Sequence, residues 1–259
     1  KRQDSPSRRE DIRTGCPALE LLTGGHMMGS STRGTEMRHL LVTGLIAALL
    51  IVPSTSLANE EASTAATFGP GEAETVDAMH DQALTLSGEG EYAGARDLLE
   101  QVVETYTRVL GTEDPVTLMA MNNLASTLWD LRDFAAARDL FEQALEAFTR
   151  VLGPEHPDTL MAMSNLANTL AVLGDPASAR DLFEQVLEAR TRVLGPEHAD
   201  TLTAGNDLAS TLGSLGDYAG ARDLLDQLLE ARTRVLDPEH PDTLWTKDLL
   251  DAALAAAAQ

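Results

Sequence analysis

The sequence predicts an all-α protein, an α-solenoid of stacked helix-turn-helix repeats, and three observations lead to this prediction. From residue 76 onward the chain repeats itself every 42 residues. Each copy holds two segments whose apolar residues recur at spacings of three and four, the period of a helix with one buried face. Asp, Gly or Pro stands at the segment ends, where helices begin and stop. One helix pair cannot bury both apolar faces, whereas stacked pairs cover one another.

Composition limits both the core and the partners. Of 259 residues, 43% are hydrophobic but only 4% are aromatic, so the core must consist mainly of Leu, Ala, Val and Met. The formal net charge is −22, from 41 acidic and 19 basic residues. So acidic a surface repels phosphate backbones and anionic membranes, and we expect no nucleic-acid partner. The single cysteine, Cys16, precedes the repeats, which therefore contain neither a disulfide nor a thiol nucleophile.

The N-terminal part of the chain differs from the repeats. Residues 1–36 are rich in Arg, Ser and Gly and show no periodicity. We interpret this segment as disordered or as lying upstream of the true start. Met27, Met28 and Met37 are each possible initiators.

Residues 37–58 have the three parts of a secretory signal peptide. After a short basic start, 13 uncharged residues (40–52) precede Pro53, and a Ser-Leu-Ala cleavage sequence ends at Ala58. A membrane span needs roughly 20 apolar residues, so no stable span is expected in the mature chain; a buried core helix is the other alternative. We expect export to the periplasm or the medium after cleavage near Ala58, with a flexible lead-in over 59–75.

The repeat domain is expected over residues 76–259. Its four copies and terminal half-repeat span about 77–118, 119–160, 161–202, 203–244 and 245–259. In the third copy, Asp158 is the expected N-cap of the first helix and Gly174 its left-handed C-terminal residue. The apolar stripe of this helix comprises Leu160, Met163, Ala167, Leu170 and Leu173.

The second helix of the third copy should begin at Asp175-Pro176, because proline suits the first helical position. Gly195-Pro196 should end it. Its predicted stripe comprises Ala179, Leu182, Phe183, Val186, Leu187, Ala189 and Leu194. Recurring small residues should let neighbouring helices approach closely, and they are Ala125, Ala167 and Ala209 in first helices and Ala95, Ala137, Ala179 and Ala221 in second helices.

Several strings in these copies resemble the tetratricopeptide repeat. They are Asn-Asn-Leu-Ala at 122–125, Ser-Asn-Leu-Ala at 164–167 and Arg-Val-Leu-Gly-Pro-Glu-His-Pro-Asp-Thr-Leu at 150–160. The 42-residue period is similar to that of kinesin light chains and many bacterial proteins. The resemblance implies a right-handed superhelix whose first helices line a concave groove, and a non-catalytic scaffold that binds a protein or peptide there. It carries over no motor-associated role.

If that geometry holds, polar residues of the first helices face the groove. The residues expected to contact a peptide are Asn122, Asn123, Ser126, Trp129, Ser164, Asn165, Asn168, Asn206, Asp207 and Ser210. Asparagine both donates and accepts, so a ladder of asparagines can bind the backbone of an extended peptide. The alternatives are that Asn123 and Asn165 bridge neighbouring helices and that Trp129 packs between repeats.

The charge pattern favours a neutral or basic partner. None of the first helices in the four copies carries an inward basic residue, so capture of a C-terminal carboxylate is not expected. A different hypothesis is a structural module that self-associates through 245–259, an Ala-rich half-repeat in which Leu249, Leu250 and Leu254 could dock against another chain.

The repeats show no motif for catalysis or for a cofactor. His156, His198 and His240 recur in the sequence Pro-Glu-His, which suggests metal ligands. However, one histidine per repeat places neighbours on the order of 10 Å apart, whereas zinc ligands converge at about 2 Å from one ion. A turn between helices is therefore the favoured interpretation. We expect no catalytic residue, no metal and no cofactor.

Overall fold

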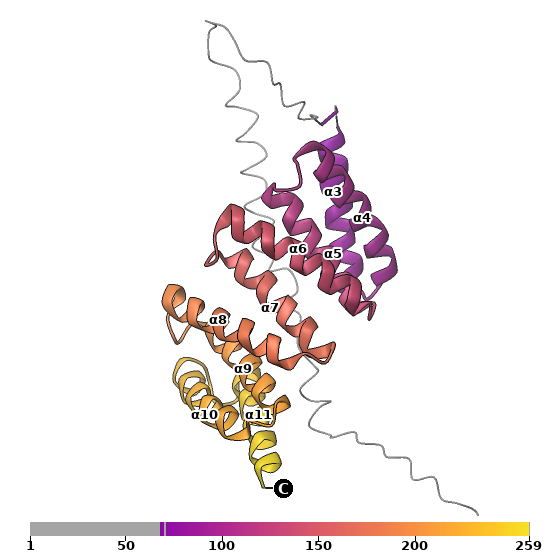
Figure 1. Cartoon of the computed structure of the whole chain (residues 1–259). Coiled ribbons are helices and arrows are strands. Elements are labelled where there is room, and N and C mark those ends of the chain that lie inside the picture. Colours follow the sequence, from indigo (N-terminus) through magenta and orange to yellow (C-terminus); the bar gives the residue numbers. More distant parts are fainter. Residues whose placement is uncertain (1–67, 70, 259) are drawn as a thin grey trace, which may run out of the picture.

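The computed structural model describes residues 68–69 and 71–258, and all regular structure in this part is helical, as predicted (Figure 1). Four helix hairpins and a final single helix follow one another. The elements are α3 (Glu72–Gly88) and α4 (Tyr92–Val109), α5 (Pro115–Asp130) and α6 (Phe134–Leu152), α7 (Pro157–Val172) and α8 (Pro176–Leu194), α9 (Ala199–Ser214) and α10 (Tyr218–Val235), and α11 (Pro241–Ala257).

The hairpins stack in sequence order, and Figure 1 shows the stack running from α3 to α11. Each helix packs against the next one along the chain. Each odd-numbered helix also touches the next odd-numbered helix, whereas no two even-numbered helices touch within the described residues. Because the odd-numbered helices lie closer together, they form the inner layer of a curved solenoid and the even-numbered helices form the outer layer.

The first helix of the third hairpin begins earlier than the sequence suggested. Its N-cap is His156, whose ring Nδ1 accepts a hydrogen bond from the Asp158 N–H at 3.2 Å, with Pro157 at the first helical position. The expected cap, Asp158, is therefore inside the helix. An unprotonated imidazole nitrogen satisfies a free N–H as a carboxylate does, and Asp114 caps α5 in the equivalent place.

The second helices and the connections between the two helices follow the prediction closely. Asp175 caps α8 by accepting from the Ser178 N–H at 3.1 Å, and Pro176 occupies the first position. Gly174 has a φ of 88°, the left-handed conformation that glycine adopts without strain. In the second hairpin the equivalent residue is Arg132, with a φ of 65°.

The small residues lie at the centre of the core. The seven alanines predicted to allow close approach are at most 1% exposed. Ala125, Ala137 and Phe141 form one cluster, and Ala209, Ala221 and Leu225 belong to the equivalent cluster of the fourth hairpin. Each first helix thus meets its own second helix through a seam of alanines, which lets the backbones approach closely.

Two predicted core leucines lie at the surface instead. Leu173 is 41% exposed and Leu194 is 40% exposed. Leu173 is the C-cap residue of α7 and Leu194 the last residue of α8. Helix periodicity does not hold a side chain against the core beyond the last full turn, so the stripe prediction was wrong at these ends.

The predicted boundaries fall partly outside the described residues. The disordered segment 1–36 and the signal peptide 37–58 lie outside them. The lead-in 59–75 is described only near its end, where α3 already begins at Glu72, whose carboxylate accepts from the Gly69 N–H at 2.8 Å. The helix pairs start about four residues before the predicted copies.

None of the described helices is long and apolar enough to cross a membrane.

Candidate partner-binding surface on the inner layer

The asparagines expected in the groove join neighbouring inner helices. Asn123 in α5 hydrogen-bonds the His80 ring in α3 at 2.9 Å, and Asn165 in α7 donates to Asn122 in α5 at 3.5 Å. Asn206 in α9 donates to Thr246 in α11 at 3.0 Å. These four asparagines are all buried. The alternative that Asn123 and Asn165 bridge neighbouring helices therefore describes their position, and contact of these asparagines with a peptide stays a prediction.

Trp129 and Ser164 are buried as well. Trp129 packs edge to face against Phe134, with ring centroids 5.6 Å apart, and its indole N–H has no hydrogen-bond partner. The Ser164 hydroxyl donates to the Leu160 carbonyl within its own helix. The Trp129 ring is therefore part of the core, and the Ser164 hydroxyl has its hydrogen bond within its own helix.

The remaining predicted contact residues are half-buried. Ser126, Asn168, Asp207 and Ser210 keep part of their surface in solvent. Ser126 donates to the Asn122 carbonyl at 3.0 Å. Within the described residues, the side chains of Asn168, Asp207 and Ser210 have neither a hydrogen bond nor an ion pair. Asp207 and Ser210 share one face of α9, since they are three residues apart, and α9 contacts α7, which carries Asn168.

Two buried arginines near this surface were missed by the sequence prediction. Arg190 in α8 is 5% exposed and Arg232 in α10 is 1% exposed. The Arg190 Nη1 donates to the Asp200 carbonyl at 3.0 Å, and the Arg232 Nη1 donates to the Asp242 carbonyl at 2.7 Å. Both guanidinium groups thus reach from the outer layer to the first turn of an inner helix. Reading every 42nd residue would have found them, because the series is Tyr106, Phe148, Arg190 and Arg232.

The environment of Arg232 is polar on one side and aromatic on the other. Its Nη2 donates to the Thr203 hydroxyl at 3.3 Å, while its Nε has no partner. The guanidinium carbon lies 5.8 Å from the centroid of the Trp245 ring. The charge is therefore fixed in place by contacts from α9 and α11.

Asp207 lies within electrostatic reach of both arginines. Desolvation raises the pKa of its carboxyl group to about 7, and the positive charges of Arg190 and Arg232 offset only part of that increase. Within the described residues, no ion pair joins the Asp207 carboxylate to either guanidinium group, and Arg232 instead lies 3.9 Å from the Asp242 carboxylate. A half-buried carboxylate without a donor is an acceptor available to a ligand.

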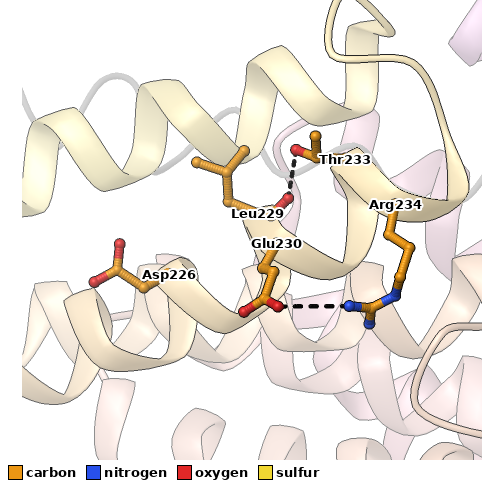
Figure 2. Close-up of a pocket in the computed structure, with 5 residues that line it drawn as sticks. All are labelled: Asp226, Leu229, Glu230, Thr233 and Arg234. Atoms are coloured by element: carbon orange, nitrogen blue, oxygen red, sulfur yellow. Dashed lines mark hydrogen bonds and ion pairs between the residues drawn. The ribbon is translucent and has the colours of Figure 1, made fainter.

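The outer layer, in contrast, carries one Arg–Asp pair that recurs on each helix. Arg138 lies 2.6 Å from Asp139, and the same pair recurs in the other three outer helices. Figure 2 shows a depression along α10, lined by Asp226, Leu229, Glu230, Thr233 and Arg234. Glu230 and Arg234, one turn apart on α10, form an ion pair at 3.6 Å, and Arg234 also pairs with Glu197. This hollow offers a ligand few unpaired groups.

The recurring histidines are helix caps. His156, His198 and His240 each accept from the backbone N–H two residues later, at 3.2 Å. No group of three or more metal-ligating side chains occurs in the part of the chain that the structure describes. The interpretation that these three histidines belong to turns between helices thus explains why they recur once per repeat.

The fold defines the class of the protein, a solenoid of stacked helix hairpins. The tetratricopeptide repeat family matches residues 74–149, 116–192 and 159–232. The chain therefore belongs to the tetratricopeptide repeat family. A search of curated proteins finds no match.

Solved structures support the same assignment. Nearly identical TPR-like repeats attributed to a kinesin light chain of Podosopora anserina are 29% identical, with a TM-score of 0.65, and cover 71% of this chain and 88% of that one. A point variant of that protein is 28% identical, with a TM-score of 0.67, over 74% and 90%. BtubC (BKLC) from P. vanneervenii is 20% identical, with a TM-score of 0.62, over 73% and 74%, and shows the fold alone.

Proposed function

We propose that this protein is a non-catalytic scaffold that binds a protein or peptide segment along its inner layer. The observation that carries the proposal is the contrast between the two layers. The same Arg–Asp pair recurs on all four outer helices, whereas the side chains of Asn168, Asp207 and Ser210 on the inner layer lie half-buried without a hydrogen bond or ion pair in the described part of the chain. Polar groups partly removed from water and left unpaired gain free energy when a ligand supplies their hydrogen bonds.

The partner is expected to be neutral or basic. With a net charge of −22, the chain attracts cations at long range and repels acidic segments. On α3, α5, α7 and α9 every charged side chain is acidic. An acidic partner would meet like charge on four successive inner helices, which lowers its association rate.

Site-specific photocrosslinking in cells tests this proposal. A photoreactive residue replacing Asn168 should crosslink a partner, since position 168 is half-buried on α7 of the inner layer. The matched control is Gln185 on α8, an exposed outer-layer residue that donates only to a carbonyl of its own helix. Crosslinks from position 185 alone, or from neither position, would contradict binding on the inner layer.

We further propose that the chain is exported, on the strength of the signal-peptide pattern of residues 37–58. N-terminal sequencing of the protein recovered from the periplasm or the medium should begin near Asn59. Recovery from the cytoplasm with residues 37–58 still attached would contradict export.

Self-association through α11 is less favoured than binding of a different partner. Leu244 and Leu254 on α11 are 39% and 45% exposed, which would suit docking. However, Asp251 takes the place of Ala209 and Ala167, the alanines that meet the second helix of their own hairpin. Lys247 and Asp248 are exposed beside it. This polar face is typical of a terminal cap, and light scattering should report a monomer.

A further inference from the structure

A buried histidine joins the first hairpin to the second. His80 on α3 is 0% exposed, and the side-chain amide nitrogen of Asn123 on α5 lies 2.9 Å from Nε2 of its ring. An amide nitrogen can only donate, so Nε2 is the unprotonated acceptor of this hydrogen bond. The joint between α3 and α5 therefore depends on a ring nitrogen that acid can protonate.

Two later joints of the inner layer use groups that do not titrate in the same range. Asn122 stands 42 residues after His80 and accepts a hydrogen bond from Asn165 of the next inner helix at 3.5 Å. Asn206, in the same series of positions, donates to Thr246 of α11 at 3.0 Å. Amide and hydroxyl side chains carry no charge that changes between about pH 5 and 7. Of these three joints, only that of the first hairpin responds directly to acid.

The surroundings of His80 are mainly uncharged. The Tyr106 ring of α4 packs against the imidazole edge to face, with centroids 6.1 Å apart, and residues 115–129 of α5 include no charged side chain. On α3 itself, Asp77 stands three residues before His80 and accepts a hydrogen bond from the Tyr106 hydroxyl at 2.5 Å. Asp81, the next residue along α3, is exposed.

The charged side chains of α4 all keep part of their surface in solvent, and they are Arg96, Asp97, Glu100, Glu104 and Arg108. Asp77 is thus the nearest carboxylate that could compensate a positive charge on His80. It offsets part of the cost of desolvating that charge. Protonation would also convert Nε2 from acceptor to donor and break the hydrogen bond from Asn123. The closed hairpin therefore disfavours the protonated ring.

We propose that His80 is an acid-sensitive joint that releases α3 and α4 from the rest of the solenoid as the pH falls from about 7 to about 5. Opening of the first hairpin exposes the ring, which takes up a proton below about pH 6.5. Because the open state binds this proton and the closed state excludes it, acid shifts the equilibrium towards opening. The inner layer would then lose its first helix. This inference goes beyond partner binding and does not depend on it.

Hydrogen–deuterium exchange of the full chain at about pH 5, 6 and 7 tests the proposal. Protection factors, which correct for the direct effect of pH on exchange, should fall in α3 by up to about twentyfold between pH 7 and 5. This is the factor expected when one histidine is protonated only in the open state. Protection in α6 and α8, which contain no histidine and begin at aspartate caps, should stay nearly constant.

Two substitutions of His80 remove the titrating ring and keep a polar partner for Asn123. H80N installs the residue found at position 122, and H80Q places an amide at about the reach of Nε2. In both variants, protection in α3 should lose its dependence on pH. The matched control is H156N, because His156 is a cap with a partly exposed ring and asparagine also caps helices. H156N should leave the fall in α3 unchanged.

Three results would overturn the proposal. The first is protection in α3 of the wild-type chain that stays constant from pH 7 to 5. The second is an equal fall in wild type, H80N and H80Q, since other groups would then cause it. The third is a fall of the same size in α6 and α8, which would mean that acid loosens the whole solenoid and not its first joint.

Discussion

In the first two hairpins the second helix places an aromatic side chain, Tyr106 or Phe148, beneath the inner layer, and in the last two the same position holds Arg190 or Arg232. All four side chains are buried, so one architecture accommodates a ring or a guanidinium group at the same place. The ring packs against apolar neighbours, as Phe148 does with Leu118. The arginines instead bind main-chain carbonyls of the next inner helix. A repeated backbone thus fixes where a side chain lies but not its chemistry.

The largest expected effect comes from removing one arginine from the C-terminal half. Arg232→Ala should lower the free energy of unfolding by about 3 kcal/mol, because it removes a large side chain that is 1% exposed and leaves a cavity in its place. Urea unfolding measures the change. Arg232→Phe, which copies Phe148, is the control and should stay close to wild type. Equal destabilisation by the two substitutions would contradict the idea that either chemistry fits this position.

The alanine seam, unlike that position, should respond identically in both halves. Ala137→Leu in the N-terminal half and Ala179→Leu in the C-terminal half should each cost about 1–3 kcal/mol, because the added methyl groups overpack a site with no exposed surface. Thermal unfolding of either variant at the wild-type temperature would refute the packing assignment for that hairpin.

The pH dependence of stability should distinguish the C-terminal half through Asp207. Its pKa is about 7 in the folded chain and 3.8 as the reference value, so the folded state binds an extra proton between these values. The contribution of Asp207 to the free energy of unfolding is therefore largest at about pH 4 and below. It decreases as the pH rises towards 7. Asp207→Asn should remove this decline and raise Tm at pH 8 by about 2–4 °C.

Asp130→Asn is the matched variant in the N-terminal half. Desolvation also raises the pKa of Asp130, with Arg132 opposing it, but by a smaller amount. Its effect on the slope of Tm against pH should have the same sign and a smaller size. A steeper slope after Asp207→Asn, measured by calorimetry from pH 4 to 8, would show that the sign is wrong.

The smallest expected effect concerns the left-handed turn of the second hairpin. Arg132 has a φ of 65°, whereas Gly90, Gly174 and Gly216 fill the equivalent turns. Arg132→Gly should stabilise the chain by about 0.5 kcal/mol, since relief of left-handed strain exceeds the lost contact with Phe134. Gly174→Arg is the reverse test and should destabilise by a similar amount. No difference in Tm for either variant would contradict a strained turn.

The sequence by itself determined the helices, the period and the alanine seam. Spacing of three and four marks one face of a helix, and a small residue recurring every 42 positions must meet the same neighbour in every copy. These are local or periodic properties, so Ala167 and Ala179 were identified without coordinates. The caps were only partly foreseen, because His156 is an unusual N-cap and Asp158 looked like a better one.

Only the tertiary structure decided which polar residues remain available to a partner. Asn165 and Asn168 are both polar residues of α7, yet Asn165 donates a hydrogen bond to the preceding inner helix, and Asn168 is half-buried without a hydrogen-bond partner among the described residues. Side-chain pairing between helices depends on how closely and at which rotation the hairpins stack, which no single copy encodes. The same stacking places Arg190 of the third hairpin within electrostatic reach of Asp207 in the fourth, to which Arg232 of the fourth hairpin adds its charge.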